Sequence, residues 1–374
     1  MDVIGFVKKD YLLAISAVLA LLSLFLVPFE TVTTYSYGRI METICTLLMF
    51  ILIVAGLKEC NALDRLAYMT VINIRTTRTL CLALVFLPFF CAMLFSNDVA
   101  LLTFVPLSLM LLSMADLKRY MVIVVVLQTV AANIGSYLTP FGNPHNLYIY
   151  NLHDQIGFSL WEYESALIPI VAVGTIVILA TIMLMKNMPL TSELEEHEWI
   201  TDSKTLAVII TLFILAIASV LDIIPYYITL AIVVAAFLII MPSIFLNVNY
   251  SILFVFFFLF VFANGLTNMS EVHSLVSDLM EWDPMLTTVL VSQFTSNVPS
   301  TILLQPFTDD WAAVLVGANI GGFGTAIASM ASVISIKFYL QEKDASIMEY
   351  LKVFTAMSAV LLVTLIPTYY IFCV

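Results

Sequence analysis

The sequence predicts an all-α integral membrane protein built from two inverted-topology repeats, each with a re-entrant helical hairpin and a discontinuous transmembrane helix. Of its 374 residues, 62% are hydrophobic and only 11% are charged, and the mean hydropathy is +1.07, a balance outside that of soluble domains. Apolar runs long enough to cross a hydrocarbon core of about 30 Å recur along the chain and predict about nine full spans. Polar motifs interrupt these runs at matching places in the two halves, which predicts the two hairpins and the two broken helices.

The first repeat is predicted at residues 1–186. No small-residue cleavage site follows the apolar segment after Lys8 and Lys9, so this segment is interpreted as a retained span and not as a signal peptide. Residues 79–115 are interrupted by "SND" (96–98), which indicates a hairpin that enters and leaves the membrane on one side. The full spans expected in this repeat are 10–29, 39–57, 119–150 and 166–185, with an interfacial stretch at 58–75.

An acidic loop and one linking helix are predicted at 187–225. The loop contains "TSELEEHEWITD" (191–202), whose charges are expected to be solvated, so the net charge of −12 is not taken as a sign of a basic ligand. The helix expected at 204–221 adds a single crossing. Because the four crossings of the first repeat return the chain to its starting side, this extra crossing places the second half upside down.

The second repeat is predicted at 226–374. Its apolar stretch 284–308 is interrupted by "TSNVPS" and indicates the second hairpin. Fewer residues separate Asn297 from Asn319 than Asn97 from Asn133, so this hairpin must return by a shorter arm. The full spans expected in this repeat are 226–242, 249–266, 311–340 and 347–372, with an interfacial stretch at 267–283.

Two polar segments match between the halves. "NIGSYLTPFGNPHNL" from Asn133 aligns without gaps to "NIGGFGTAIASMASV" from Asn319, and the Ser-Asn pairs at 96–97 and 296–297 correspond upstream. The glycines and prolines of the first segment place a break inside a predicted span of about 30 residues. Unwound backbone at membrane depth is tolerated only where protein or a watery cavity surrounds it, so the two breaks and the two hairpin tips should meet.

The positions of lysine and arginine predict the orientation of the chain. Positively charged residues concentrate at cytoplasmic ends of membrane proteins. With a cytoplasmic amino terminus and an outside carboxyl terminus, only Arg39 falls on the outer side. The residues that fall at cytoplasmic ends are Lys8, Lys9, Lys58, Arg65, Arg75, Arg78, Lys118, Arg119, Lys186, Lys204, Lys337, Lys343 and Lys352.

The interrupting motifs also resemble those of a known superfamily. "SNDVALLTFVP", "LTPFGNPHNLY", "SNVPSTILL" and "GANIGGFGTAIASMAS" resemble the ion-transporter superfamily, particularly permeases of the arsenite-permease and sodium/proton-antiporter type, and more distantly the citrate and divalent anion/sodium symporters. The resemblance implies two cation sites that flank a central anion site, an elevator-like movement and a homodimer. The dicarboxylate members carry Ser-Asn-Thr at both tips, so Ser-Asn-Asp and Ser-Asn-Val argue against a dicarboxylate substrate.

Asn, Ser and Thr supply oxygen ligands for Na⁺ and donors for an anion without a buried permanent charge. The predicted cation-binding residues are Ser96, Asn97, Thr139 and Asn143 for one site, and Ser296, Asn297, Thr325 and Ser329 for the other. The residues predicted to face the substrate are Asn146, His145, Ser332 and Asp98. Helix capping and hydrogen bonds that repair the broken backbone are the structural alternative for these residues.

Asp98 and His145 are the ionisable residues of the predicted core. An ionisable residue inside the membrane is a functional candidate, and Asp98 could carry a proton or bind Na⁺, or else cap the returning arm of its hairpin. His145 could bind an anion when protonated, carry a coupled proton, or be a neutral hydrogen-bonded side chain. The sequence leaves these alternatives open.

The sequence therefore predicts a secondary active transporter that moves a small anion across the plasma (inner) membrane, coupled to Na⁺ or H⁺. A sodium/proton antiporter and an arsenite efflux permease on the same scaffold are the alternatives. No nucleophile and base pair, zinc-protease motif or Walker A motif indicates an enzyme, and no ring of charge supports a channel. Beyond the coupling ion no cofactor is expected; the scattered cysteines predict neither disulfides nor zinc. The expected partners are the small anionic solute, membrane lipid and a second copy, with no nucleic acid.

Overall fold

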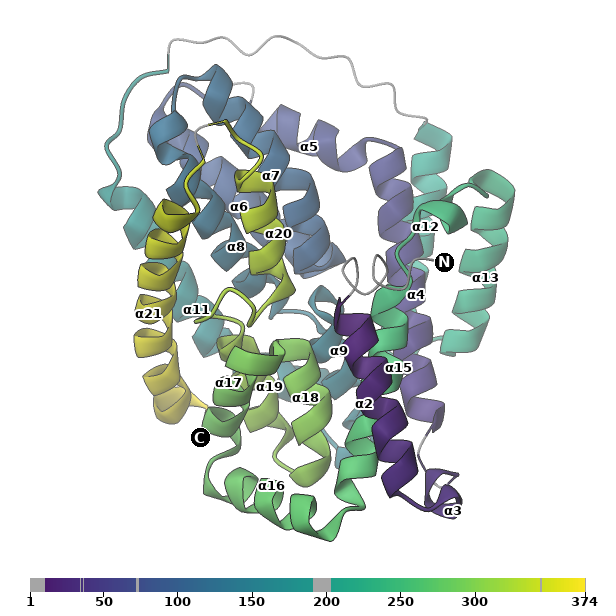
Figure 1. Ribbon diagram of the computed structural model, residues 1–374. Coiled ribbons are helices and arrows are strands. Elements are labelled where there is room, and N and C mark those ends of the chain that lie inside the picture. The colour runs from purple at the N-terminus through teal and green to yellow at the C-terminus, as the bar shows by residue number, and fades with distance from the viewer. Residues whose placement is uncertain are drawn as a thin grey trace.

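The computed structural model describes residues 11–33, 35, 37–71, 74–190, 203–343 and 345–373. Within these ranges the regular structure is helical, apart from an isolated β-bridge between Thr76 and Pro189 (Figure 1). The prediction of an all-α membrane protein is confirmed. The acidic stretch predicted at 191–202 and the basic pair Lys8 and Lys9 lie outside the described residues.

The first half of the chain contains the first hairpin and the first broken helix. The hairpin predicted at 79–115 consists of α6 and α7, and the broken helix predicted at 119–150 consists of α8 and α9 with a break between them. The elements of this half are α2 (Tyr11–Leu26), α3 (Phe29–Val32), α4 (Tyr37–Glu59), α5 (Ala62–Val71), α6 (Thr77–Phe95), α7 (Asn97–Met114), η1 (Lys118–Tyr120), α8 (Met121–Ser136), η2 (Pro140–Gly142), α9 (Pro144–Tyr150), α10 (His153–Ile156) and α11 (Leu160–Leu184).

The second half repeats this order after the linking helix α12 (Ser203–Val220). Its hairpin is α17 with α18, and its broken helix is α19 with α20. The elements are α13 (Tyr226–Ile240), α14 (Ile244–Asn247), α15 (Ser251–Thr267), α16 (Ser270–Trp282), α17 (Pro284–Thr295), α18 (Asn297–Leu304), η3 (Gln305–Phe307), α19 (Trp311–Gly321), α20 (Met330–Tyr339) and α21 (Ile347–Phe372). The returning arm α18 has 8 residues against 18 in α7, as the spacing predicts.

Seven helices among the described residues are long and apolar enough to cross a membrane, or eight if the bent pair of α15 and α16 is one span. This count differs from the expected nine for a physical reason. α2, α13 and α15 have only 16, 15 and 17 residues, and the two parts of the second broken helix, α19 and α20, have 11 and 10, fewer than the roughly 20 of a straight span. Both arms of the first hairpin are long and apolar enough to cross a membrane. The arms of the second hairpin, with 12 and 8 residues, are too short.

The two hairpins lie at opposite ends of the molecule (Figure 1). The first hairpin and α5 lie in the upper part of the view, and the second hairpin and α16 lie in the lower part. The second long helix of each half packs on the first helix of the other. A Cβ added at Gly56 of α4 would lie 2.8 Å from the ring of Phe237 in α13, and one added at Gly265 of α15 would lie 2.6 Å from Cβ of Ser23 in α2.

Each broken helix packs directly on the first arm of its own hairpin. A Cβ added at Gly135 of α8 would lie 2.1 Å from the carbonyl oxygen of Phe89 in α6, and one added at Gly321 of α19 would lie 2.7 Å from the side chain of Ser292 in α17. The glycines of the two Asn-Ile-Gly motifs are therefore required for close approach of the helices. This packing holds each break beside the tip of its hairpin.

Basic residues concentrate at one end of the molecule, where Glu342 and Glu349 lie beside them. At this end Lys118, Arg119 and Lys343 line one cavity, and Arg78 donates to the carbonyl oxygens of Met183 and Met185 at 2.9 Å. The acidic cluster around Asp222 lies at the end where α9 finishes.

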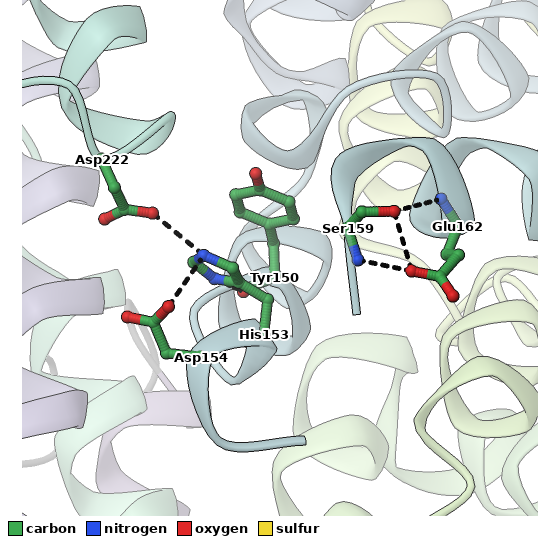
Figure 2. Close-up of polar contacts among 6 residues, drawn as sticks. All are labelled: Tyr150, His153, Asp154, Ser159, Glu162 and Asp222. Carbon is green, nitrogen blue, oxygen red and sulfur yellow. Dashed lines mark hydrogen bonds and ion pairs between the residues drawn. The ribbon is translucent and has the colours of Figure 1, made fainter. Parts of the chain in front are cut away.

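At the acidic end the segment after α9 is fastened to the turn between α12 and α13 (Figure 2). His153 Nε2 lies 3.0 Å from a carboxylate oxygen of Asp222 and 3.4 Å from one of Asp154. Its ring stacks on Tyr150 with centroids 4.8 Å apart. A capping box between Ser159 and Glu162, in which Ser159 Oγ accepts from the Glu162 amide and the carboxylate accepts from the Ser159 amide, then begins α11.

Candidate functional site

Both hairpin tips contain a serine in a backbone conformation that favours glycine. Ser96 has φ 107° and ψ 150°, and Ser296 has φ 74° and ψ 156°. Such a conformation costs a non-glycine residue about 1–3 kcal/mol and persists only where the surroundings impose it. After each serine, the asparagine Oδ1 accepts a hydrogen bond from the next main-chain amide, at 2.8 Å from Asp98 and 3.0 Å from Val298. The two tips therefore share one local structure.

The two breaks also end in the same way. Asn143 begins α9 with φ −147° and ψ 142°, and Ser329 begins α20 with φ −140° and ψ 134°. Neither side chain caps its own helix, so the amide of Asn143 and the hydroxyl of Ser329 are free to face other groups. Asn143 Nδ2 donates to Ser136 Oγ at 2.9 Å, and Ser329 Oγ lies 3.4 Å from Asn133 Oδ1.

A small cavity of about 20 Å³ lies where the tips and the breaks meet. Both hairpins and both broken helices contribute to its wall, together with one residue of α15. The lining residues are Asn97, Asp98, Asn143, Pro144, Ile252, Ser296, Asn297, Val298, Pro299, Ser329 and Met330. The convergence expected from the sequence is therefore present in the structure.

Four helices begin at this cavity, namely α7, α9, α18 and α20. A helix amino terminus carries about half a positive charge and exposes amide N–H groups, so the three longer helices, α7, α18 and α20, create a potential that favours an anion. No lysine, arginine or histidine is among the lining residues that the structure describes. The attraction for negative charge therefore comes from the backbone.

The same cavity offers oxygen ligands to a cation. Asn97, Asn297 and Ser296 bring amide and hydroxyl oxygens, and Asp98 brings a carboxylate. Asp98 Oδ1 is buried without a hydrogen-bond partner among the described residues. A water molecule needs at least about 10–15 Å³ of such volume, so 20 Å³ accommodates one water or one small ion. An organic anion would require this cavity to widen.

A second buried polar network joins the two broken helices. His145 Nε2 lies 3.1 Å from Asn319 Oδ1, and Asn319 Nδ2 donates to Asn146 Oδ1 at 2.8 Å. Tyr137 donates its hydroxyl to the carbonyl oxygen of Asn319. Because Asn319 Oδ1 is an acceptor here, His145 carries its proton on Nε2, and its Nδ1 has no partner among the described groups.

The structure brings together six of the predicted site residues and separates the others. Asn97, Asp98, Asn143, Ser296, Asn297 and Ser329 line the cavity. Ser96 adjoins it without lining it. Thr139 and Thr325 instead donate their hydroxyls to the carbonyl oxygens of Met93 and Gln293, at 2.6 and 2.9 Å.

The three other residues predicted to face a substrate lie elsewhere. His145 and Asn146 point toward α19, and Ser332 Oγ is buried without a partner among the described residues. None of the three lines the small cavity. Their role as substrate ligands stays a prediction.

Asn133 is the residue that the predicted site omitted. Its Oδ1 accepts from Asn97 Nδ2 at 2.7 Å and lies within reach of Ser329, so it connects the first tip with both broken helices. Its Nδ2 is buried without a partner in the described part of the chain. The signal was present in the alignment, where Asn133 corresponds to Asn319 at the start of both Asn-Ile-Gly motifs.

Comparison with known proteins agrees with this architecture. A family model described as citrate transporter matches residues 4–314, a range that contains both hairpins, the first broken helix and the start of α19. An uncharacterized transporter of Methanocaldococcus jannaschii is 29% identical over 303 residues, which cover 79% of this chain and 80% of that protein. The inner membrane protein YbiR of Escherichia coli is 28% identical over 306 residues, or 79% of each chain. The resemblance to ion-transporter superfamily permeases is confirmed, and the chain belongs to the citrate transporter family as a multi-pass membrane transporter and not an enzyme.

Proposed function

We propose that this protein is a secondary active transporter that moves a small anion across the plasma membrane, coupled to Na⁺ or H⁺. The observation that carries the proposal is the cavity at which the amino termini of α7, α18 and α20 meet amide, hydroxyl and carboxylate oxygens. Paired broken helices with this arrangement are the usual construction of transporter sites, in which amino termini face the anion and oxygens bind the cation.

The substrate class follows from the potential of the site. Helix ends attract an anion without the cost of burying a lysine or arginine. The family name suggests a carboxylate-bearing solute, although Ser-Asn-Asp and Ser-Asn-Val at the tips depart from the dicarboxylate pattern. Citrate therefore belongs first in a substrate screen, with dicarboxylates, phosphate, sulfate and arsenite beside it.

The cation is assigned to the residues that line the cavity. Asn97 and Asn143 with Asp98 form the first set, and Ser296, Asn297 and Ser329 form the second. Equivalent tips and breaks supply the two sets, which supports a pair of sites related by an inverted repeat. In an elevator-type mechanism, the two hairpins and the broken helices would move together against α4, α13, α2 and α15. This movement would expose the cavity to one side of the membrane and then to the other.

The orientation of the protein follows from its charged ends. The end that contains Lys118, Arg119 and Lys343 is assigned to the cytoplasm by the positive-inside bias, which puts the end around Asp222 outside. With this assignment we propose a cytoplasmic amino terminus and an outside carboxyl terminus. The inner membrane location of the Escherichia coli relative supports the plasma membrane, and a homodimer is the proposed assembly.

The test is transport by the purified protein in liposomes with an imposed Na⁺ or pH gradient and each anion in turn. We expect uptake of one anion class that depends on the cation gradient. Asn97→Ala and Asn297→Ala should each raise the Na⁺ concentration needed for half-maximal uptake by about tenfold, the effect of about 1.4 kcal/mol of lost ligand binding. The exposed Asn247→Ala is the matched control. Unchanged Na⁺ dependence in both tip variants would refute the site assignment.

A sodium/proton antiporter is the second candidate function, because the unpaired carboxylate of Asp98 is the ionisable group of the cavity. In that case a Na⁺ gradient drives proton flux with no anion present. Asp98→Asn should abolish this flux, because the amide cannot take up a proton in exchange for Na⁺. Cation exchange without any anion would replace the symport proposal.

A further inference from the structure

A second polar cavity, of about 210 Å³, lies at the acidic end between the hairpin core and the helices α4 and α15. It is separate from the small cavity between the tips and shares none of its lining residues. Its polar wall consists of Thr43, Asn151, Asn264, Gln305, Thr308 and Asp309. None of these residues has a role in the proposed transport site.

The hydrogen bonds of this wall leave oxygen atoms for a ligand. Asn151 Nδ2 donates to Thr43 Oγ1 at 2.9 Å, and Asn264 Nδ2 donates to the carbonyl oxygen of Phe260 at 2.9 Å. These bonds orient both side-chain amides and use only their Nδ2 atoms, so the Oδ1 atoms of Asn151 and Asn264 are not used by them. Gln305 adds a further amide, and Asp309 adds a carboxylate. The wall is therefore rich in acceptors.

The charge of the cavity favours a cation. Asp309 is the acidic residue of the wall, and no lysine, arginine or histidine lines it among the residues that the structure describes. The same end of the molecule carries Asp310, and it carries Asp154 and Asp222 with His153 between their carboxylates. A cleft lined by one sign of charge raises the local concentration of counter-ions.

The size of the cavity fits an ion that keeps its water. The volume of about 210 Å³ is more than ten times the roughly 10–15 Å³ that one water molecule needs, so the cavity holds several water molecules or a sodium ion with its first hydration shell. The cavity between the tips has about one tenth of this volume. An ion that moved from the larger cavity to the smaller one would have to lose most of its hydration, and the oxygens of the tips would replace it.

Two helices connect the cavities. α9 begins at the small cavity with Pro144 and ends at the larger one with Tyr148 and Asn151. α18 begins with Asn297 at the small cavity, and Gln305 follows its end at the larger one. At 1.5 Å per residue, the 7 and 8 residues of these helices separate the cavities by about 10–12 Å.

We propose that the cavity around Asp309 is an entry site for hydrated Na⁺, from which the coupling ion reaches the cavity between the hairpin tips. The proposal rests on the cation coupling proposed above and names the ion. Asp309, Asn151 and Asn264 hold the hydrated ion, and α9 and α18 form the route to the tips.

Trp311 provides a direct readout of binding that does not depend on transport. It begins α19 two residues after Asp309, and its ring stacks on Phe158 with centroids 3.8 Å apart. Replacement of Trp161, Trp199 and Trp282 with Phe leaves Trp311 as the single tryptophan of the full chain. Its fluorescence is then titrated with NaCl in detergent, with choline chloride added to keep the ionic strength constant.

We expect a saturable change of Trp311 fluorescence with Na⁺ and none with choline. Asp309→Asn should raise the apparent dissociation constant by about tenfold or more, because it removes the charge nearest the ion. Asp310→Asn is the matched control. It removes the neighbouring charge while Asn still caps α19, where the Asp310 carboxylate accepts from the Ala313 amide at 2.9 Å. Asn264→Ala provides a second, uncharged test of the wall.

The outcomes separate this proposal from the proposed function. No saturable Na⁺ response in the folded protein, or equal weakening by Asp309→Asn and Asp310→Asn, overturns the entry site. Sodium-dependent anion uptake whose Na⁺ affinity is unchanged in Asp309→Asn also overturns it and leaves the transport function intact. Sodium binding that Asp309→Asn weakens, in a protein whose transport ignores Na⁺, supports the site and overturns sodium coupling.

Discussion

Asn97 donates an amide hydrogen bond to Asn133 Oδ1 over 2.7 Å, and both side chains are buried. This bond joins the first hairpin tip to the first broken helix at the level of the small cavity. Ser329, from the second broken helix, reaches the same oxygen atom at 3.4 Å. Asn133 is therefore the point at which the two halves share a polar contact next to the proposed site.

Replacement of Asn133 by alanine should destabilise the protein. The change leaves the buried amide of Asn97 without its acceptor, which costs about 1–3 kcal/mol. We expect a lower midpoint of thermal unfolding in detergent and a weaker response of that midpoint to Na⁺. The exposed Asn247→Ala should change neither. Equal midpoints for Asn133→Ala and the parent protein would show that the contact contributes nothing.

Variants of Thr139 and Thr325 test whether these residues have a structural role or bind the cation. Thr139 donates its hydroxyl to the carbonyl oxygen of Met93 in α6, and Thr325 donates to that of Gln293 in α17. Thr139→Val and Thr325→Val should therefore each lower the free energy of unfolding by about 1 kcal/mol. The Na⁺ affinity of transport should stay within about twofold, because neither residue lines the small cavity. Asn143→Ala and Ser329→Ala alter the wall of the small cavity, so they should weaken the Na⁺ affinity of transport more. A tenfold loss in both threonine variants would restore these residues to the cation sites.

The sequence predicted the order of the elements well because the interruptions are chemically distinct from their surroundings. Pro140 and Pro144 cannot lie in the interior of a regular helix, so they locate the first break to within a few residues. The first hairpin, expected at 79–115, is formed by Thr77–Met114. The convergence of tips and breaks followed from the need to satisfy unwound backbone.

Side-chain direction was not available from the same pattern. His145 and Asn146 lie in the first turn of α9, and successive residues of a helix point about 100° apart, so only Asn143 and Pro144 of this segment face the small cavity. A gapless alignment cannot show that rotation. The span count differed because α2, α13 and α15 are shorter than their apolar runs suggest and because α19 and α20 are each too short to cross alone.

The strain at the first tip can be released by a single substitution. Ser96 occupies a backbone conformation that glycine adopts freely, and its side chain makes no cap hydrogen bond. Ser96→Gly should therefore stabilise the protein by about 1 kcal/mol or more, measured as a higher unfolding midpoint. Ser96→Ala removes the hydroxyl but keeps the strain, and it should leave the midpoint close to that of the parent. A lower midpoint for Ser96→Gly than for Ser96→Ala would contradict the assigned strain.

The contact between Asp222 and His153 should make stability depend on pH (Figure 2). Burial raises the pKa of the Asp222 carboxyl above its ordinary value, although the facing His153 opposes the shift and Asp154 adds to it. A carboxyl with a raised pKa in the folded state contributes stability that is present below its ordinary pKa and lost as the pH rises through the raised value. The folded protein therefore loses stability relative to a variant that cannot ionise at this position.

Asp222→Asn is that variant, because asparagine tolerates the positive φ of 54° at this position. The unfolding midpoint of the Asp222→Asn protein minus that of the parent should grow as the pH is raised from about 4, the ordinary pKa of aspartate, to about 7. The exposed Asp278→Asn on α16 is the control for a general effect of net charge. A difference that is flat or shrinks with rising pH would mean that pairing with His153 outweighs the cost of burying Asp222.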